Sequence, residues 1–129
     1  MSKSENFEIL NTTKGKLPSL PFLQMKDSVL GKDYSLSLVF IKSDKSKELN
    51  KIHRDKNKPA NILSFPLSKN SGEIFIDMEE SKKQAPSFEE KHGTFIGVLF
   101  IHGLLHLKGM PHGSKMEGKE KEIRARFGF

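Results

Sequence analysis

Apolar and polar residues alternate along the chain with two different periods, and these periods predict its secondary structure. Alternation at every second position is typical of strands, whereas apolar residues three or four positions apart are typical of helices. Tyr34 to Ile41 begins in alternation and ends in a continuous apolar run, which predicts a central strand buried on both faces. Pro66 cannot donate a hydrogen bond to a neighbouring strand, so a strand that it ends is expected at a sheet edge or beside a cleft. The pattern predicts four strands, at residues 7–12, 34–41, 62–65 and 73–77.

Longer stretches between and after these strands predict helices. The apolar run from Phe95 to Ile101 contains no proline and is too long for a strand, so it predicts a buried helix. Ser87 and Glu90 stand before it with the spacing of a capping box, which favours a helix start at this point. Further helices are predicted at residues 21–30, at 44–53 with Asp44 as the N-cap, and at 115–126, where charged residues surround a few apolar ones.

Three of the five histidines fall within eleven residues, directly after the apolar run. On a helix His102 and His106 share one face at positions i and i+4, about 6 Å apart, which suits two imidazoles that bind one Zn²⁺ at about 2.0–2.1 Å each. Gly109 ends a helix at little steric cost and Pro111 blocks its continuation, so His112 can turn back to the same face. A single histidine on an apolar face is usually a hydrogen-bonded core residue. Three at metal spacing favour a site with open positions, as in catalytic zinc centres.

The spacing H-x3-H-x5-H resembles the long zinc-protease signature H-E-x-x-H-x-x-G-x-x-H, with one difference. Gly103 stands where those enzymes carry the glutamate that acts as general base. The spacing therefore predicts a metal site that lacks the proton acceptor of a peptidase.

Length and composition narrow the class of protein. A chain of 129 residues suits one domain, residues 1–129, with a sizeable core. It contains no cysteine, which excludes a disulfide framework, a thiolate metal ligand and a cysteine nucleophile. The first six residues are polar and lead into no apolar signal core, and no apolar run approaches the ~20 residues that span a bilayer. These observations predict a cytoplasmic protein without a membrane partner.

The chain carries a formal net charge of +6, from 22 basic and 16 acidic residues. An excess of positive charge favours a polyanionic partner such as nucleic acid. Part of this charge lies in the loop-like cluster at residues 54–58. On the residues alone Arg54 has two interpretations: a solvated loop arginine, or a fixed cation that stabilises the charge developing on a phosphodiester.

Three segments together resemble the YbeY family of bacterial rRNA-maturation endoribonucleases. The resemblance rests on H-G-x-L-H-L-x-G-x-x-H from His102 to His112, on R-x-K-x-K-P-x-N-x-L-S-F-P from Arg54 to Pro66, and on G-E-I at residues 72–74. The histidine motif with glycine at its second position is specific, and the second motif follows the expected order. The chain differs from the family pattern at Met110-Pro111, where Tyr-Asp is usual, and that change removes an aspartate that could have oriented a metal ligand.

The resemblance implies a single α+β domain, with a mixed sheet of about four strands packed by helices and a three-histidine metal helix-turn. It implies one Zn²⁺ per chain bound by His102, His106 and His112, and catalytic roles for these histidines and for Arg54. The implied activity is cleavage of single-stranded RNA in maturation of the small-subunit rRNA 3′ end and in ribosome quality control. The implied partners are single-stranded RNA or rRNA and the ribosome or small-subunit components, and no DNA partner is expected.

Two other functions remain open. A ribosome-associated RNA-binding assembly factor, whose zinc site is mainly structural, is equally compatible with the basic charge. Turnover of single-stranded RNA, with the metal removed and then restored, separates that function from the nuclease. A metal-dependent hydrolase of another substrate is the third hypothesis, and Gly103 argues against peptides as that substrate.

Overall fold

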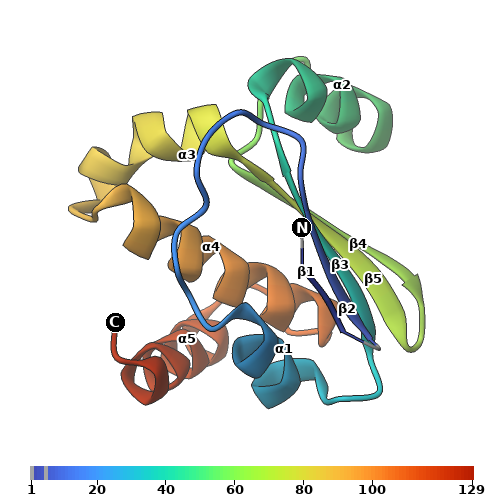
Figure 1. Cartoon of the computed structure of the whole chain (residues 1–129), viewed down its shortest axis with the longest axis vertical. Coiled ribbons are helices and arrows are strands. Elements are labelled where there is room, and N and C mark those ends of the chain that lie inside the picture. The colour runs from blue at the N-terminus through green and yellow to red at the C-terminus, as the bar shows by residue number, and fades with distance from the viewer. Residues whose placement is uncertain (1, 5) are drawn as a thin grey trace.

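The computed structural model describes residues 2–4 and 6–129, and these residues form one mixed β-sheet covered by helices (Figure 1). The strand order is β1-β2-β3-β5-β4. Three strands run parallel at the centre, namely β2 (Phe7–Asn11), β3 (Ser35–Ile41) and β5 (Ser71–Asp77). Antiparallel strands form the two edges, β1 (Ser2–Ser4) beside β2 and β4 (Ile62–Ser68) beside β5. The predicted α+β class with a mixed sheet is confirmed, and the described sheet has one strand more than the four predicted, because the short β1 pairs with β2.

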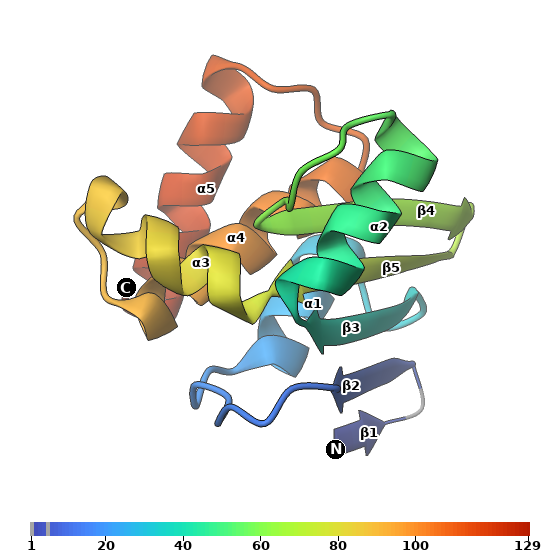
Figure 2. The same ribbon diagram turned by 90° about the horizontal axis from the view of Figure 1, so that it is seen from above.

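Helices lie on both sides of this sheet. Figures 1 and 2 show α1 (Phe22–Leu30), α4 (His92–Leu107) and α5 (Ser114–Phe127) on one side, and α2 (Ser43–Arg54) on the other. The four helical regions expected from the sequence are therefore present. Across the described part of the chain, no helix combines the length and apolar character needed to cross a membrane.

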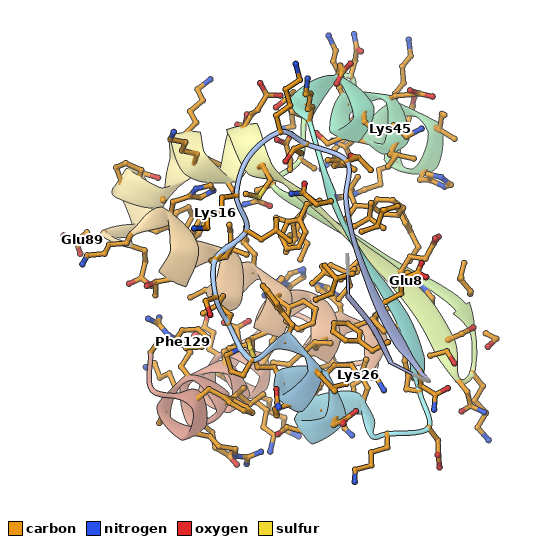
Figure 3. All side chains as sticks on the ribbon, in the orientation of Figure 1. Glu8, Lys16, Lys26, Lys45, Glu89 and Phe129 are labelled. Carbon is orange, nitrogen blue, oxygen red and sulfur yellow. The ribbon has the colours of Figure 1, made fainter. Side chains whose placement is uncertain are left out.

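Helix α4 supplies the centre of the hydrophobic core. Its side chains Phe95, Ile96, Phe100 and Leu104 are each no more than 2% exposed. Phe100 meets Phe22 of α1 edge to face, with ring centroids 5.2 Å apart, a favourable geometry for aromatic pairs. Figure 3 shows apolar side chains filling the space between the sheet and the helices on this side. Burial of this helix fixes the position of the histidines near its C-terminal end.

Gly103 lies where α4 packs closely against the sheet. A Cβ at this position would lie 2.9 Å from Cδ1 of Ile62 on β4 and 3.1 Å from Cδ1 of Ile74 on β5. Position 103 therefore faces the sheet, and a longer side chain there would collide with it. A glutamate at this position, as in the zinc-protease signature, would therefore have to displace these isoleucine side chains.

The end of α4 turns the chain back as the glycine and proline predicted. Gly109 has a φ of +97°, in the left-handed region where glycine carries no steric penalty. Its N–H donates to the carbonyl of His106 at 2.9 Å, and the N–H of Met110 donates to the carbonyl of Leu105 at 3.0 Å. This pair of hydrogen bonds is the Schellman arrangement that closes a helix.

Buried Asp77, at the end of β5, anchors α2 beside the sheet. Its carboxylate accepts hydrogen bonds from the hydroxyls of Ser43 and Ser46 on α2, at 3.0 and 2.5 Å. It also accepts from the N–H groups of Glu79 and Glu80, and thereby caps α3 (Met78–Gln84). One carboxylate thus ties two helices to the sheet and sets the direction of α2, which ends at Arg54.

The predicted capping box before α4 is wrong. Ser87 lies in the 3-10 turn η1 (Ala85–Phe88), where its hydroxyl donates to the carbonyl of Gln84 at 2.7 Å. Glu89 then adopts a left-handed conformation with a φ of 56°, and α4 begins only at His92. The extra turn separates the serine from the helix it was expected to cap.

Two smaller predictions also fail at element ends. Asp44 is not the N-cap of α2, because Lys42 occupies that position and makes no side-chain hydrogen bond there. The N–H of Ser43, at the first position of the helix, donates instead to Oε1 of Glu79 at 2.8 Å. Pro66 does not end β4, which continues to Ser68 with an irregular register. The edge position expected for this strand is confirmed, and an edge strand tolerates proline because one side of its backbone has no partner strand.

Candidate metal centre

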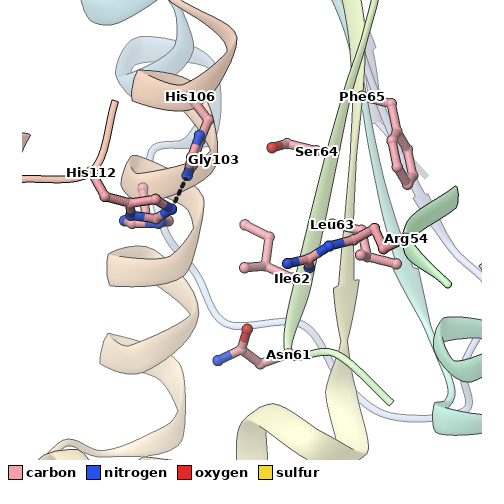
Figure 4. Close-up of a pocket in the computed structure, with 10 residues that line it drawn as sticks. Arg54, Asn61, Ile62, Leu63, Ser64, Phe65, Gly103, His106 and His112 are labelled. Atoms are coloured by element: carbon pink, nitrogen blue, oxygen red, sulfur yellow. Dashed lines mark hydrogen bonds between the residues drawn. The ribbon is translucent and has the colours of Figure 1, made fainter. Parts of the chain in front are cut away.

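The structure brings three histidines together from one helix and the turn that follows it. His102 and His106 lie on α4, and His112 lies between α4 and α5. One ring nitrogen from each lies within 4.8 Å of the other two. Nε2 of His106 is 2.9 Å from Nε2 of His112, the contact drawn as a dashed line in Figure 4. This cluster of three nitrogens is a donor set that can hold a metal ion.

Glu120 on α5 fixes the orientation of one of these rings. Its Oε1 lies 2.7 Å from Nδ1 of His102, and both side chains are less than a third exposed. A metal-binding histidine commonly donates its second N–H to a carboxylate, which sets the tautomer and leaves the other nitrogen for the metal. This contact supplies the orienting carboxylate that Met110-Pro111 had put in doubt. The residues present therefore fit a divalent metal.

Sequence reasoning missed Glu120, although a weak signal for it exists. It lies four residues after Met116 and three before Ile123, the two buried apolar residues of α5. Positions with this spacing share one helix face. Glu120 is thus a carboxylate on the inward face of an otherwise solvated helix, a placement that carboxylates adopt at a cost unless they have a partner.

The electrostatic surroundings of the cluster favour neutral imidazole at His106. Burial is the main cause that lowers the pKa of His106, and the positive charges of His102, His112 and Arg54 lower it further, whereas Glu120 acts in the opposite direction. A metal ligand must be the deprotonated form of histidine. The lowered pKa therefore keeps His106 in the state that a metal requires.

The histidines form one wall of a cleft of about 360 Å³, and β4 with the end of α2 forms the other. Figure 4 shows Arg54, Asn61 and Ser64 pointing toward the histidines, while the ring of Phe65 points away from them. Among the described residues, the guanidinium of Arg54 has neither a hydrogen bond nor an ion pair. An arginine without a partner in a cleft is available to an anion, and its planar guanidinium suits phosphate oxygens.

The loop after Arg54 is held by the helix that carries it. Asp55 ends α2 in a left-handed conformation with a φ of 55°, and Nδ2 of Asn50 donates to the carbonyl of Lys58 at 2.8 Å. These contacts lead the chain directly into β4. His53, an exposed histidine on α2, stacks near Phe65 with ring centroids 4.6 Å apart and lies outside the cluster.

The fold and the site together define an α+β protein with a histidine cluster that can bind a metal ion beside an arginine-lined cleft. Comparison with known proteins gives the family. The chain belongs to the YbeY family, because the family model described as Endoribonuclease YbeY matches residues 5–128.

Relatives and a solved structure agree with this membership. An Endoribonuclease YbeY of Aliarcobacter butzleri is 30% identical over 129 residues, covering 93% of this chain and 91% of the relative. One from Acholeplasma laidlawii is 34% identical over 90 residues, covering 67% of this chain and 66% of the relative. The solution structure of a Thermotoga maritima protein superimposes with a TM-score of 0.64 at 26% identity, over 91% of this chain and 85% of that one.

Proposed function

We propose that this protein is a zinc-dependent endoribonuclease that cleaves single-stranded RNA. Membership of the YbeY family supports an endoribonuclease role. The observation that carries the proposal is the placement of Arg54, which has no partner in the described part of the chain, across one cleft from His102, His106 and His112. The proposed setting is the cytoplasm, in maturation of the small-subunit rRNA 3′ end and in ribosome quality control, with the ribosome or its small-subunit components as partners.

Residues on the two walls of the cleft have different roles toward a bound phosphodiester. The histidines would hold one zinc ion, which would supply Lewis acidity at the phosphoryl group. Arg54 binds the non-bridging oxygens from the opposite wall and stabilises the additional negative charge that develops in the transition state. Glu120 holds the ring of His102, and Ser64 and Asn61 offer hydrogen bonds beside the substrate. No step requires a glutamate at position 103.

Metal dependence of RNA turnover is the test of this proposal. The purified protein should cleave a single-stranded RNA, lose that activity when a chelator removes the metal, and regain it when one equivalent of zinc is restored. RNA binding without turnover, in the presence and absence of zinc, would instead assign the protein to the second candidate function, an RNA-binding assembly factor with a structural zinc.

Glu120→Gln should weaken zinc binding without removing a ligand. Loss of an outer contact to a metal-binding histidine typically lowers metal affinity about 10- to 100-fold. Competition with a chromophoric chelator measures the change, and nitrogen chemical shifts of the His102 ring report its tautomer. Glu117→Gln is the matched control, since Glu117 lies on the exposed first turn of the same helix. Equal zinc affinity for both variants would show that Glu120 does not support the site.

Affinity for single-stranded RNA should fall steeply with salt. Lysine and arginine side chains that neutralise phosphates release counterions, and the log-log slope is about −0.7 for each phosphate contact on a single strand. Lys56→Gln, in the exposed loop after Arg54, should make the slope less steep by about 0.7. Lys119→Gln should change it little, because Nζ of Lys119 lies 3.3 Å from Oε1 of Glu122 on the same helix, α5, and is already paired with that carboxylate. Filter-binding titrations between low and moderate salt measure the slopes, and a constant affinity would contradict an electrostatic interface.

A further inference from the structure

A second hollow opens directly beside the metal cleft. It has a volume of about 350 Å³ and shares three lining residues with the cleft, Asn61, Ile62 and His102. Its remaining lining comes from the turn η1, from α4 and from Glu120. A substrate bound at the histidines can therefore extend into this hollow without leaving the surface of the protein.

One wall of this hollow is an exposed aromatic ring, that of Phe88. Phe88 is 59% exposed, which is unusual for a side chain of this size and type. Its ring lies almost parallel to that of Phe95, with centroids 4.9 Å apart and planes 22° apart. Phe95 is buried in the core and only 2% exposed, so it supports one face of Phe88 while other parts of the ring remain open. This arrangement is a platform on which a flat ring can stack.

The platform is held in a fixed position relative to the cleft. The N–H groups of Glu89 and Glu90 donate to the carbonyls of Pro86 and Ala85, at 3.0 and 3.1 Å, and close the turn behind Phe88. At the other end of η1, Nδ2 of Asn61 donates to Oε1 of Gln84 at 2.8 Å. The hydrogen-bonded turn therefore holds the ring of Phe88 in its exposed position beside the hollow.

The chemistry of the hollow suits a nucleobase better than a phosphate. Its walls are mainly the apolar side chains of Phe88, Phe95, Val98 and Leu99, and no lysine or arginine of the described residues lines it. The side-chain oxygen of Asn61 has no hydrogen-bond partner among the described residues and can accept from a base amino group. Proteins that recognise single-stranded RNA stack unpaired bases on aromatic rings beside a cationic track for the backbone.

We propose that this hollow binds one unpaired base of the RNA, stacked on Phe88, next to the phosphodiester held between the histidines and Arg54. The inference rests on the proposed function and adds a source of preference for single strands. A base in a duplex is already stacked and paired and cannot enter the hollow. The phosphate is bound by charge and the neighbouring base by stacking, so the two contacts recognise different parts of the substrate.

A single tryptophan tests the proposal directly. The chain contains no tryptophan, so Phe88→Trp introduces one fluorophore at the platform. A chelator first removes any metal from the variant, so that the RNA is not cleaved. The variant is then titrated with three ligands: a short single-stranded oligoribonucleotide, a ribose-phosphate oligomer of equal length that lacks bases, and an RNA duplex. Strong quenching by the single strand, and weak quenching by the other two at saturation, is the expected result. Equal quenching by the baseless oligomer, or none from a bound single strand, overturns the proposal.

Kinetics of a second variant separate this subsite from the function itself. Phe88→Ala should lower kcat/KM for single-stranded RNA about tenfold to a hundredfold through KM, since loss of one base stack has effects of this size. Leu67→Ala is the matched control, because Leu67 is equally exposed at 62% and lines neither hollow. Unchanged kcat/KM in Phe88→Ala overturns the base site while the nuclease stands. Absence of RNA cleavage by the unaltered protein overturns the proposed function instead.

Discussion

His106→Ala should abolish stoichiometric zinc binding and, with it, RNA cleavage. His106 is one of the three proposed ligands, and its ring centroid lies 4.8 Å from that of His102 and 4.4 Å from that of His112, while those two are 4.9 Å apart. Loss of a direct ligand should lower zinc affinity by more than the roughly 10- to 100-fold that loss of an outer contact costs. Elemental analysis of the purified variant measures the zinc content, and the cleavage assay is run on the same preparation.

His53→Ala is the control for this change, because it removes an exposed histidine outside the cluster. It should retain one zinc per chain. If a variant that lacks any two of the three cluster histidines still holds stoichiometric zinc, the metal is bound elsewhere and the assignment of the ligands is wrong.

Arg54→Ala should lower kcat far more than it weakens RNA binding. In the proposed role, the contact between the guanidinium and the phosphoryl oxygens strengthens as charge develops, so its loss would act on the transition state. Removal of one such contact typically lowers the rate about 10²- to 10³-fold. Arg54→Lys should restore only part of the rate, because an ammonium cannot make the planar two-pronged contact. Zinc content should stay the same in both variants, since a charged guanidinium is no metal ligand.

Arg126→Ala provides the comparison, because Arg126 is a similarly exposed arginine on α5 that pairs with Glu122 and lies outside the cleft. It should cleave at the unaltered rate. A wild-type rate for metal-loaded Arg54→Ala would refute the role given to Arg54, and weaker binding with unchanged kcat would make it a contact that only positions the phosphate.

The parts of the site that the sequence predicts are those set by local geometry. His102 and His106 are four residues apart on a helix that its apolar run predicts. Gly109 and Pro111 predict the turn that brings His112 back to the same face. Arg54 became a candidate through a motif, and the end of α2 places it in the cleft. The histidine inference needed only local geometry, whereas Arg54 was found through the resemblance and reaches the cleft because α2 is packed beside the sheet.

Features that depend on packing between distant elements were not predictable in the same way. Glu120 meets His102 only because α5 crosses α4 at a particular angle, and charged residues surround it in sequence. The sequence around Phe88 does not show whether its side chain is buried, and its exposure depends on the turn η1. The sequence pattern did not predict α3, because this helix has a polar composition and depends on its cap from Asp77 rather than on an apolar face. The three-residue β1 is too short to show a period.

The contact between Glu120 and His102 has a consequence for the order in which the site is completed during synthesis. A ribosome makes the three histidines first and α5 afterwards, and folding during synthesis proceeds from the N-terminal side. Until α5 has emerged and packed on α4, the ring of His102 has no carboxylate to set its tautomer. The nascent chain therefore passes through a stage in which its histidines are present but His102 is not yet oriented by Glu120, and the cluster reaches its final arrangement only when α5 docks on α4.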